Sequence, residues 1–238
     1  MITLAALATL LTLAVGVSVF FVNRKRPSNQ AFAIFSILLS TWTTSILLIN
    51  IAALNILEHG MVTVKRWLVV NGFIASFGIW ALWILQSSIT KRGIGMLKTL
   101  SNSRLILVFS IFVSLIALTD SFAIVVDRFN IYRGFGYVFH NSLIGIAFLI
   151  FFITTLRNVS RHVGIERLEL QYIALTCSFS LVLLAALNGL GNLTGLRTLN
   201  RASILVVVAG YLFMAWALAH HRIFNARQVL SSVAHRGL

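Results

Sequence analysis

Long apolar runs alternate with short polar gaps along the whole chain. A helix needs about 20 mostly apolar residues to cross the hydrocarbon core of a membrane. Runs of this kind lie at Ile2–Val22, Ala31–Leu54, Trp67–Ile89, Leu105–Val126, Phe135–Leu156, Leu168–Leu190 and Ala202–Ile223. Because the gaps are short, neighbouring helices should be antiparallel. The pattern predicts an all-α integral membrane protein, a seven-transmembrane-helix bundle over residues 1–223, with a cytoplasmic tail at residues 224–238.

The composition agrees with a membrane protein and excludes a soluble globular one. Of the 238 residues, 59% are hydrophobic and 10% are charged, whereas a soluble domain has about 25% charged residues. A net charge of +14 would suggest nucleic acid in a soluble protein. Here the basic residues stand in the gaps, where they would meet anionic lipid headgroups. We therefore expect a lipid bilayer as partner and no nucleic acid.

Basic residues favour alternate gaps, which predicts the orientation. One set of gaps holds Lys65, Arg66, Arg128, Arg133, Arg197 and Arg201. The other set and the tail hold Arg24, Lys25, Arg26, Lys91, Arg92, Lys98, Arg104, Arg157, Arg161, Arg167, Arg222, Arg227 and Arg236. Because Lys and Arg accumulate on the cytoplasmic side, the N-terminus is expected outside and the C-terminus in the cytoplasm. The first helix is then an uncleaved anchor, since its basic cluster follows the apolar run.

Polar side chains gather in the outer third of the predicted bundle. At 1.5 Å per residue, Asp120 and His140 would both lie about 10 Å below the outer surface, on consecutive helices. The full set of candidate ligand-binding residues is Asn71, Asp120, His140, Asn141 and Asn188. These groups either form a small polar pocket open to the outside or tie helix ends together by hydrogen bonds. Depth follows from sequence, but rotation toward a common centre does not, so both interpretations stay open.

The sequence lacks the residues that several kinds of membrane chemistry require. A retinal Schiff base needs a buried lysine, and we expect all four lysines in gaps: Lys25, Lys65, Lys91 and Lys98. A haem held by two histidines needs them at matching depth, whereas His140 is expected near the outer end of its helix and His220 near the inner end. No run carries a metalloprotease pattern or a charge at mid-membrane, which also disfavours transport. We expect no cofactor, no metal and no catalytic residue.

The last apolar run continues into a helix-compatible exit. Ile223, Ala226, Leu230 and Val233 are spaced 3, 4 and 3 residues apart, the apolar step of a coiled-coil seam. A solvated amphipathic tail has the same pattern. The spacing would suit a homodimer whose exit helix passes motion to the cytoplasm, and the candidate signal-transmitting residues are His221, Arg222, Phe224, Ala226 and Leu230.

Three stretches carry a resemblance to a known family. They are the basic, Pro-containing gap Arg24–Phe32 with Trp42 after it; Gly164-Ile165-Glu166-Arg167 followed by Gln171-Tyr172 and Asn188; and the exit His221-Arg222-Ile223-Phe224-Asn225. With them the chain resembles the seven-transmembrane N-terminal sensor region of bacterial histidine kinases, also found on some diguanylate cyclases.

The resemblance implies a sensory input module of a two-component or related signalling system. It implies a multi-pass protein of the bacterial inner (plasma) membrane, a receptor that passes a periplasmic or in-membrane signal to a cytoplasmic kinase or cyclase output domain, in cis or in trans. Thirteen residues follow Asn225, without a phosphoacceptor helix or ATP-binding glycines, so we expect no enzyme activity in these residues. The alternative is a non-catalytic structural or assembly subunit of a larger membrane protein complex.

Overall fold

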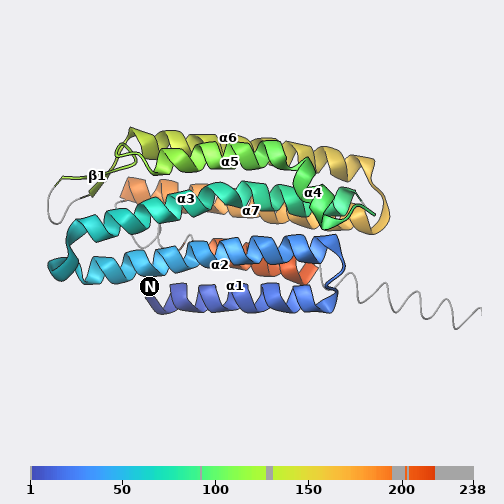
Figure 1. Cartoon of the computed structure of the whole chain (residues 1–238), viewed down its shortest axis with the longest axis horizontal. Helices are drawn as coiled ribbons and strands as arrows, with labels where there is room; N and C mark the ends of the chain where they lie inside the picture. The colour runs from blue at the N-terminus through green and yellow to red at the C-terminus, as the bar shows by residue number, and fades with distance from the viewer. Residues whose placement is uncertain (1, 92, 127–130, 195–201, 203, 218–238) are drawn as a thin grey trace, which may run out of the picture. The chain divides into compact units, whose positions relative to one another are not determined.

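The computed structural model describes residues 2–91, 93–126, 131–194, 202 and 204–217. The chain divides into two compact units, Met1–Thr154 and Thr155–Leu238. The elements in chain order (Figure 1) are α1 (Ile2–Val22), α2 (Pro27–Leu54), α3 (Ile56–Thr90), α4 (Met96–Asn102), α5 (Arg104–Ala117), β1 (Ala123–Val125), β2 (Ile131–Arg133), α6 (Phe135–Arg161) and α7 (Gly164–Thr194).

The helices confirm a multi-pass membrane protein. Among the described residues, five helical segments are long and apolar enough to cross a membrane: α1, α2, Gly60–Thr90 of α3, α6 and Gly164–Leu184 of α7. The pair α4 and α5, bent by 60°, adds a sixth if it crosses as one broken span. The last predicted run is represented by a shorter apolar helix, Ile204–Ala217. Seven spans are therefore not shown, and their orientation stays a prediction.

The fourth predicted helix, Leu105–Val126, ends early. Helix α5 stops at Ala117, and β1 then pairs antiparallel with β2 in a small hairpin. Thr119-Asp120-Ser121 supplies turn-forming side chains, and the next residues are rich in β-branched types that favour strands. The prediction that Asp120 lies inside a membrane helix is wrong, because apolarity alone does not distinguish a helix from a hairpin.

Helix α3 begins before the predicted start at Trp67. It contains Lys65, which was expected in a gap, and it breaks at Gly60, whose φ of 67° is a left-handed conformation that glycine adopts easily. Lys98 lies in α4, so the prediction that all lysines stand in gaps is wrong for these two. Lysine is hydrophilic but has a high helix propensity, so a helix can continue through it. Hydropathy therefore marks the end of an apolar run and not the end of a helix.

The first three helices pack in sequence order (Figure 1), and small residues let α1 and α2 approach closely. The buried positions of α1 recur every three or four residues and are Ala5, Ala8, Thr12, Gly16 and Val19. Hydroxyl groups join the two helices, since Thr9 Oγ1 lies 2.9 Å from Thr43 Oγ1. Small residues and hydroxyls are typical of helix contacts in membranes. Larger side chains such as Leu7 and Leu10 are exposed on the outer face of α1, where lipid would cover them.

Candidate functional site

The segment between α5 and α6 folds back over one end of the first unit. We call residues 118–134 the cap segment; 127–130 of it lie outside the described residues. The backbone N–H of Gly134 donates to the carbonyl of Phe122 (3.2 Å), and that of Gly136 donates to the carbonyl of Ser121 (3.0 Å). A Cβ on Gly134 or Gly136 would overlap Ser121. Glycine at these two positions therefore lets the cap segment rest directly on the start of α6.

Phe122 anchors the cap segment. Its side chain is buried and packs in an apolar cluster with Ala117 and Ala123. Its ring centroid lies 5.3 Å from the ring centroids of both Tyr137 and His140, both on α6. Burying a phenylalanine side chain contributes about 2–3 kcal/mol. This contribution exceeds what an exposed ion pair supplies, so Phe122 holds the cap segment down more strongly than the pair of Lys65 and Asp120 does.

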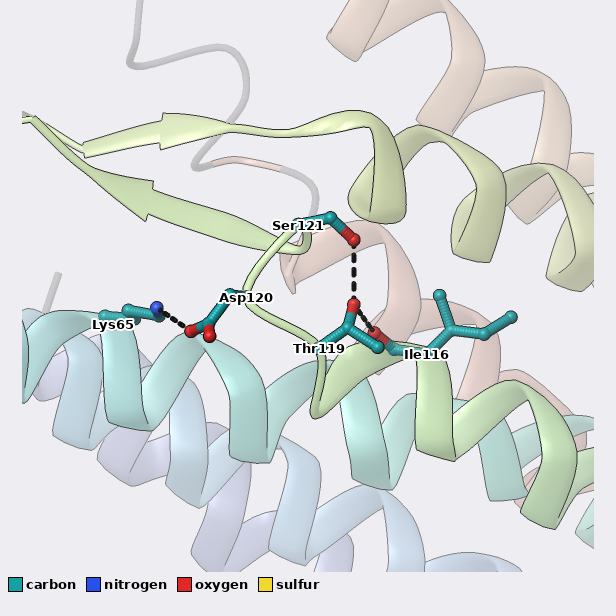
Figure 2. Close-up of polar contacts among 5 residues, drawn as sticks. All are labelled: Lys65, Ile116, Thr119, Asp120 and Ser121. Atoms are coloured by element: carbon teal, nitrogen blue, oxygen red, sulfur yellow. Dashed lines mark hydrogen bonds and ion pairs between the residues drawn. The ribbon is translucent and has the colours of Figure 1, made fainter.

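An exposed ion pair joins the cap segment to α3. The Nζ of Lys65 donates to Oδ1 of Asp120 at 2.8 Å, as Figure 2 shows, and the Asp120 side chain is otherwise fully exposed. The hydrogen bond from Lys65, and then its positive charge, lower the pKa of Asp120 below the ordinary value of 3.8. Thr119 and Ser121 flank Asp120 in sequence. Their Oγ1 and Oγ atoms lie 2.8 Å apart, and this hydrogen bond shapes the turn.

His140 is the buried polar group under the cap segment. Its side chain is 1% exposed, and Nε2 lies 3.1 Å from the carbonyl oxygen of Gly72 and 3.0 Å from Ser76 Oγ on α3. A carbonyl only accepts, so Nε2 must carry the hydrogen. The Ser76 hydroxyl also donates to the Gly72 carbonyl, which leaves its oxygen to accept from Nε2.

The second ring nitrogen of His140 is buried without a hydrogen-bond partner in the described part of the structure. With the hydrogen on Nε2, a neutral imidazole has a bare lone pair on Nδ1. Buried polar atoms are normally satisfied, and each exception calls for a physical reason. Nδ1 could accept a hydrogen bond from a ligand or take up a proton, so His140 retains bonding capacity that the described structure does not use.

The structure brings only part of the predicted ligand-binding set together. Asp120 belongs to the cap segment and His140 packs against its Phe122, but no hydrogen bond or ion pair joins Asp120 and His140 in the part of the chain described. Asn71 donates from Nδ2 to Ser45 Oγ at 2.7 Å and so binds α3 to α2. Asn141 is exposed and donates to the Tyr137 carbonyl of its own helix.

The remaining predicted residues are not placed at this site. Asn188 belongs to α7 in the second unit, and its side chain is outside the described residues. The predicted signal-transmitting residues also lie outside them: His221, Arg222, Phe224, Ala226 and Leu230. Among the residues that the structure does describe, no group of three or more His, Cys, Asp or Glu side chains could hold a metal ion.

Sequence reasoning missed Phe122 and Lys65 as parts of this site. Two signals could have found the cap segment: the turn-forming stretch Thr119–Ser121 and the glycines that flank Phe135. Together they bracket β-branched residues in the pattern of a hairpin. Gly72 and Ser76 are small residues four positions apart on α3, a spacing that favours close helix approach, and they are the two residues that His140 contacts.

No protein-family model and no curated protein matches this sequence. The resemblance to membrane sensor regions therefore rests on its short motifs, and the geometry under the cap segment has to support a function independently.

Proposed function

We propose that the chain is a membrane-embedded sensory input module of a bacterial signal-transduction protein. The observation that carries the proposal is His140, which is buried, bonded to α3 through Nε2 alone, and covered by Phe122 of the cap segment. A buried nitrogen with an unused lone pair, next to a segment joined to α3 by a few contacts, provides a group that a signal can engage and a part that can move.

The cap segment has the features of a two-state element. Its closed state is held by the Phe122 ring and by the exposed pair of Lys65 and Asp120. A signal shifts an equilibrium only through different affinities for the two states. A donor group or a proton that reaches Nδ1 of His140 would favour whichever state gives that nitrogen a partner. Since His140 joins α6 to α3, its rearrangement would change the packing of these two helices.

The proposal also assigns the chain an orientation in the membrane and a signalling output. In a bacterial inner membrane with the N-terminus outside, the cap segment faces the periplasm, because the basic turns belong on the cytoplasmic side. The signal then passes through the last helix to a kinase or cyclase output domain, in the same chain or in a partner, with a homodimer as the transmitting form. The motifs that resemble kinase sensor regions support this part.

The alternative is a structural or assembly subunit, and the hydrogen bonds between helices favour it. Thr9 with Thr43, Asn71 with Ser45 and His140 with Ser76 each join two helices. Such bonds hold a bundle together without any signal. Under this alternative, Nδ1 of His140 serves no purpose and the cap segment does not need to open.

Capture of partners from the native membrane separates the two functions. The chain is tagged at its natural locus, extracted in mild detergent and isolated, and its partners are identified by mass spectrometry. We expect a histidine kinase or a diguanylate cyclase domain, either joined to the chain or co-purified with it. Capture of other membrane subunits at fixed stoichiometry, with no kinase or cyclase, would contradict the sensory function and support an assembly role.

A further inference from the structure

One end of the first unit concentrates basic residues. Successive antiparallel helices bring the α1–α2 turn, the end of α3 and the short helix α4 to the same end, as Figure 1 shows. The basic residues there are Arg24, Lys25, Arg26, Lys91, Lys98 and Arg104, and all except the half-buried Arg26 are exposed. Acidic residues are absent from positions 1–57 and 59–119, and Glu58 lies near the start of α3, at the opposite end. Within the described residues of the first unit, this basic end therefore has no carboxylate of its own to neutralise it.

Apolar side chains lie directly beside these charges. Leu97 is 85% exposed next to Lys98, and Leu105 is 83% exposed next to Arg104. At the end of α1, the Arg24 guanidinium stacks over the Phe21 ring, 4.1 Å from its centroid. Water solvates the charged groups favourably and the apolar groups unfavourably. A ligand that complements both kinds of group has an anionic head and an apolar body.

The bend between α4 and α5 holds α4 at this end. Ser103 marks the bend of 60°, and its Oγ accepts a hydrogen bond from Trp80 Nε1 of α3 at 3.2 Å. Thr99 is buried on the inner side of α4, which contacts both α2 and α3. The helix is thus fixed to the bundle on one side and presents Leu97 and Lys98 on the other. This arrangement is typical of a segment at the boundary between headgroups and acyl chains.

We propose that the basic end binds anionic phospholipids, with their phosphates against the Lys and Arg side chains and their acyl chains against Leu97 and Leu105. A Lys or Arg near an anionic membrane surface is attracted to it within about one Debye length. Free phosphate offers the charge without the apolar body, and nucleic acid would leave the leucines uncovered. The surface is at the opposite end from the cap segment and does not depend on the sensory function.

Thermal unfolding of the full-length purified protein tests this proposal. Phosphatidylglycerol or phosphatidylcholine is added to the protein in detergent, and inorganic phosphate serves as a third probe. A ligand that binds only the folded state raises Tm. We expect phosphatidylglycerol to raise Tm by roughly 5 °C more than phosphatidylcholine, and inorganic phosphate to have no comparable effect. Equal shifts with both lipids would overturn the proposal. A shift with inorganic phosphate as large as that with phosphatidylglycerol would also overturn it, because it would show a simple anion site.

A charge-matched pair of variants locates the effect. The double variant Lys25→Gln with Lys98→Gln removes two charges from the basic end, and Arg66→Gln with Arg133→Gln removes two charges elsewhere in the same unit. The quantity compared is the shift of Tm caused by lipid, so a change in basal stability cancels. We expect the first variant to lose more than about half of the shift caused by phosphatidylglycerol and the second to keep it. Equal losses in both variants would mean that net charge alone is responsible, and would overturn the proposal.

Discussion

The ring of Phe122 occupies the space that a side chain on Gly72 would need. A Cβ at Gly72 would lie 2.5 Å from Cζ of Phe122, which is closer than atoms can pack. The carbonyl oxygen of the same glycine lies 3.1 Å from His140 Nε2. Gly72 on α3 therefore leaves room for Phe122 of the cap segment and also accepts a hydrogen bond from the buried His140. Substitutions at these and neighbouring contacts should have measurable effects.

Gly72→Ala should destabilise the protein. The added methyl group would force Phe122 out of its place, and overpacking of this kind costs about 1–3 kcal/mol. Gly78→Ala is the matched control on the same helix, because nothing lies within 4 Å of its Cβ position. There alanine should be neutral or add roughly 0.5–1 kcal/mol through its helix propensity. Unfolding of both variants by denaturing detergent measures the difference, and equal stabilities would contradict the packing of Phe122 on Gly72.

Asn29→Ala should loosen the junction between α1 and α2. The buried Asn29 Nδ2 donates to the Val19 carbonyl at 2.8 Å, and this carbonyl belongs to the last turn of α1, where helices lack internal donors. Loss of the bond should cost about 1–2 kcal/mol. Asn50→Ala removes a bond that stays within α2, to Ile46, and should cost less. The ranking is checked by the same unfolding assay and would be wrong if Asn50→Ala were the more damaging variant.

The ion pair between Lys65 and Asp120 should make the cap segment sensitive to acid. The pKa of Asp120 is lowered in the folded state from 3.8, so the stabilisation is present above the ordinary value and is lost as the pH falls through the lower folded-state value. Hydrogen exchange of amides 119–125 should be faster in Asp120→Asn than in the wild type at pH 7, and the two should converge once the pH falls below the lowered folded-state pKa of Asp120.

Two controls accompany this comparison. Adding Lys65→Gln to Asp120→Asn should have little further effect, because the pair is already broken. High salt should shrink the difference between wild type and Asp120→Asn, since both groups are close to solvent. A difference that persisted unchanged at low pH would show that Asp120 acts through something other than its charge.

The cap segment and the basic end should be labelled from opposite sides of the membrane. In a Cys177→Ser background, Ser121→Cys should react with a membrane-impermeant maleimide in intact cells, whereas Lys25→Cys should react only after lysis. Both positions are exposed, so accessibility depends on the side of the membrane. The reverse pattern would contradict the orientation derived from the basic residues.

The sequence predicts helices well where apolar runs and helices coincide. Helix α1 has the predicted bounds, because the polar stretch Asn23-Arg24-Lys25-Arg26-Pro27 follows the run directly. The cap segment is different, since Ala117 and Val126 belong to one apolar run while only the first is helical. Its fold depends on contacts with residues distant in sequence, above all Gly72 and Lys65, and single-chain hydropathy does not contain them.

The sequence predicted two residues of the candidate site, Asp120 and His140, but not the groups with which they pair. Both were expected about 10 Å below the outer surface on consecutive helices; the structure instead puts Asp120 on an exposed turn of the cap segment and His140 on α6 under Phe122. Their partners differ from the expected ones, because a charged Asp120 gains more from Lys65 at an exposed position than from burial beside a neutral histidine. Rotation about a helix axis decides such pairings, and three-dimensional packing sets that rotation.

The signalling output of two matched histidine variants tests the sensory function most directly. His140→Gln keeps a donor for the Gly72 carbonyl but removes the bare ring nitrogen, while His162→Gln makes the same substitution at a half-buried histidine near the other end of α6. Phosphorylation or cyclic-dinucleotide synthesis is measured in native membranes that contain equal amounts of each variant. We predict that His140→Gln changes this output and its response to external pH, and that His162→Gln does not. An output identical to wild type for His140→Gln would contradict a signal site under the cap segment.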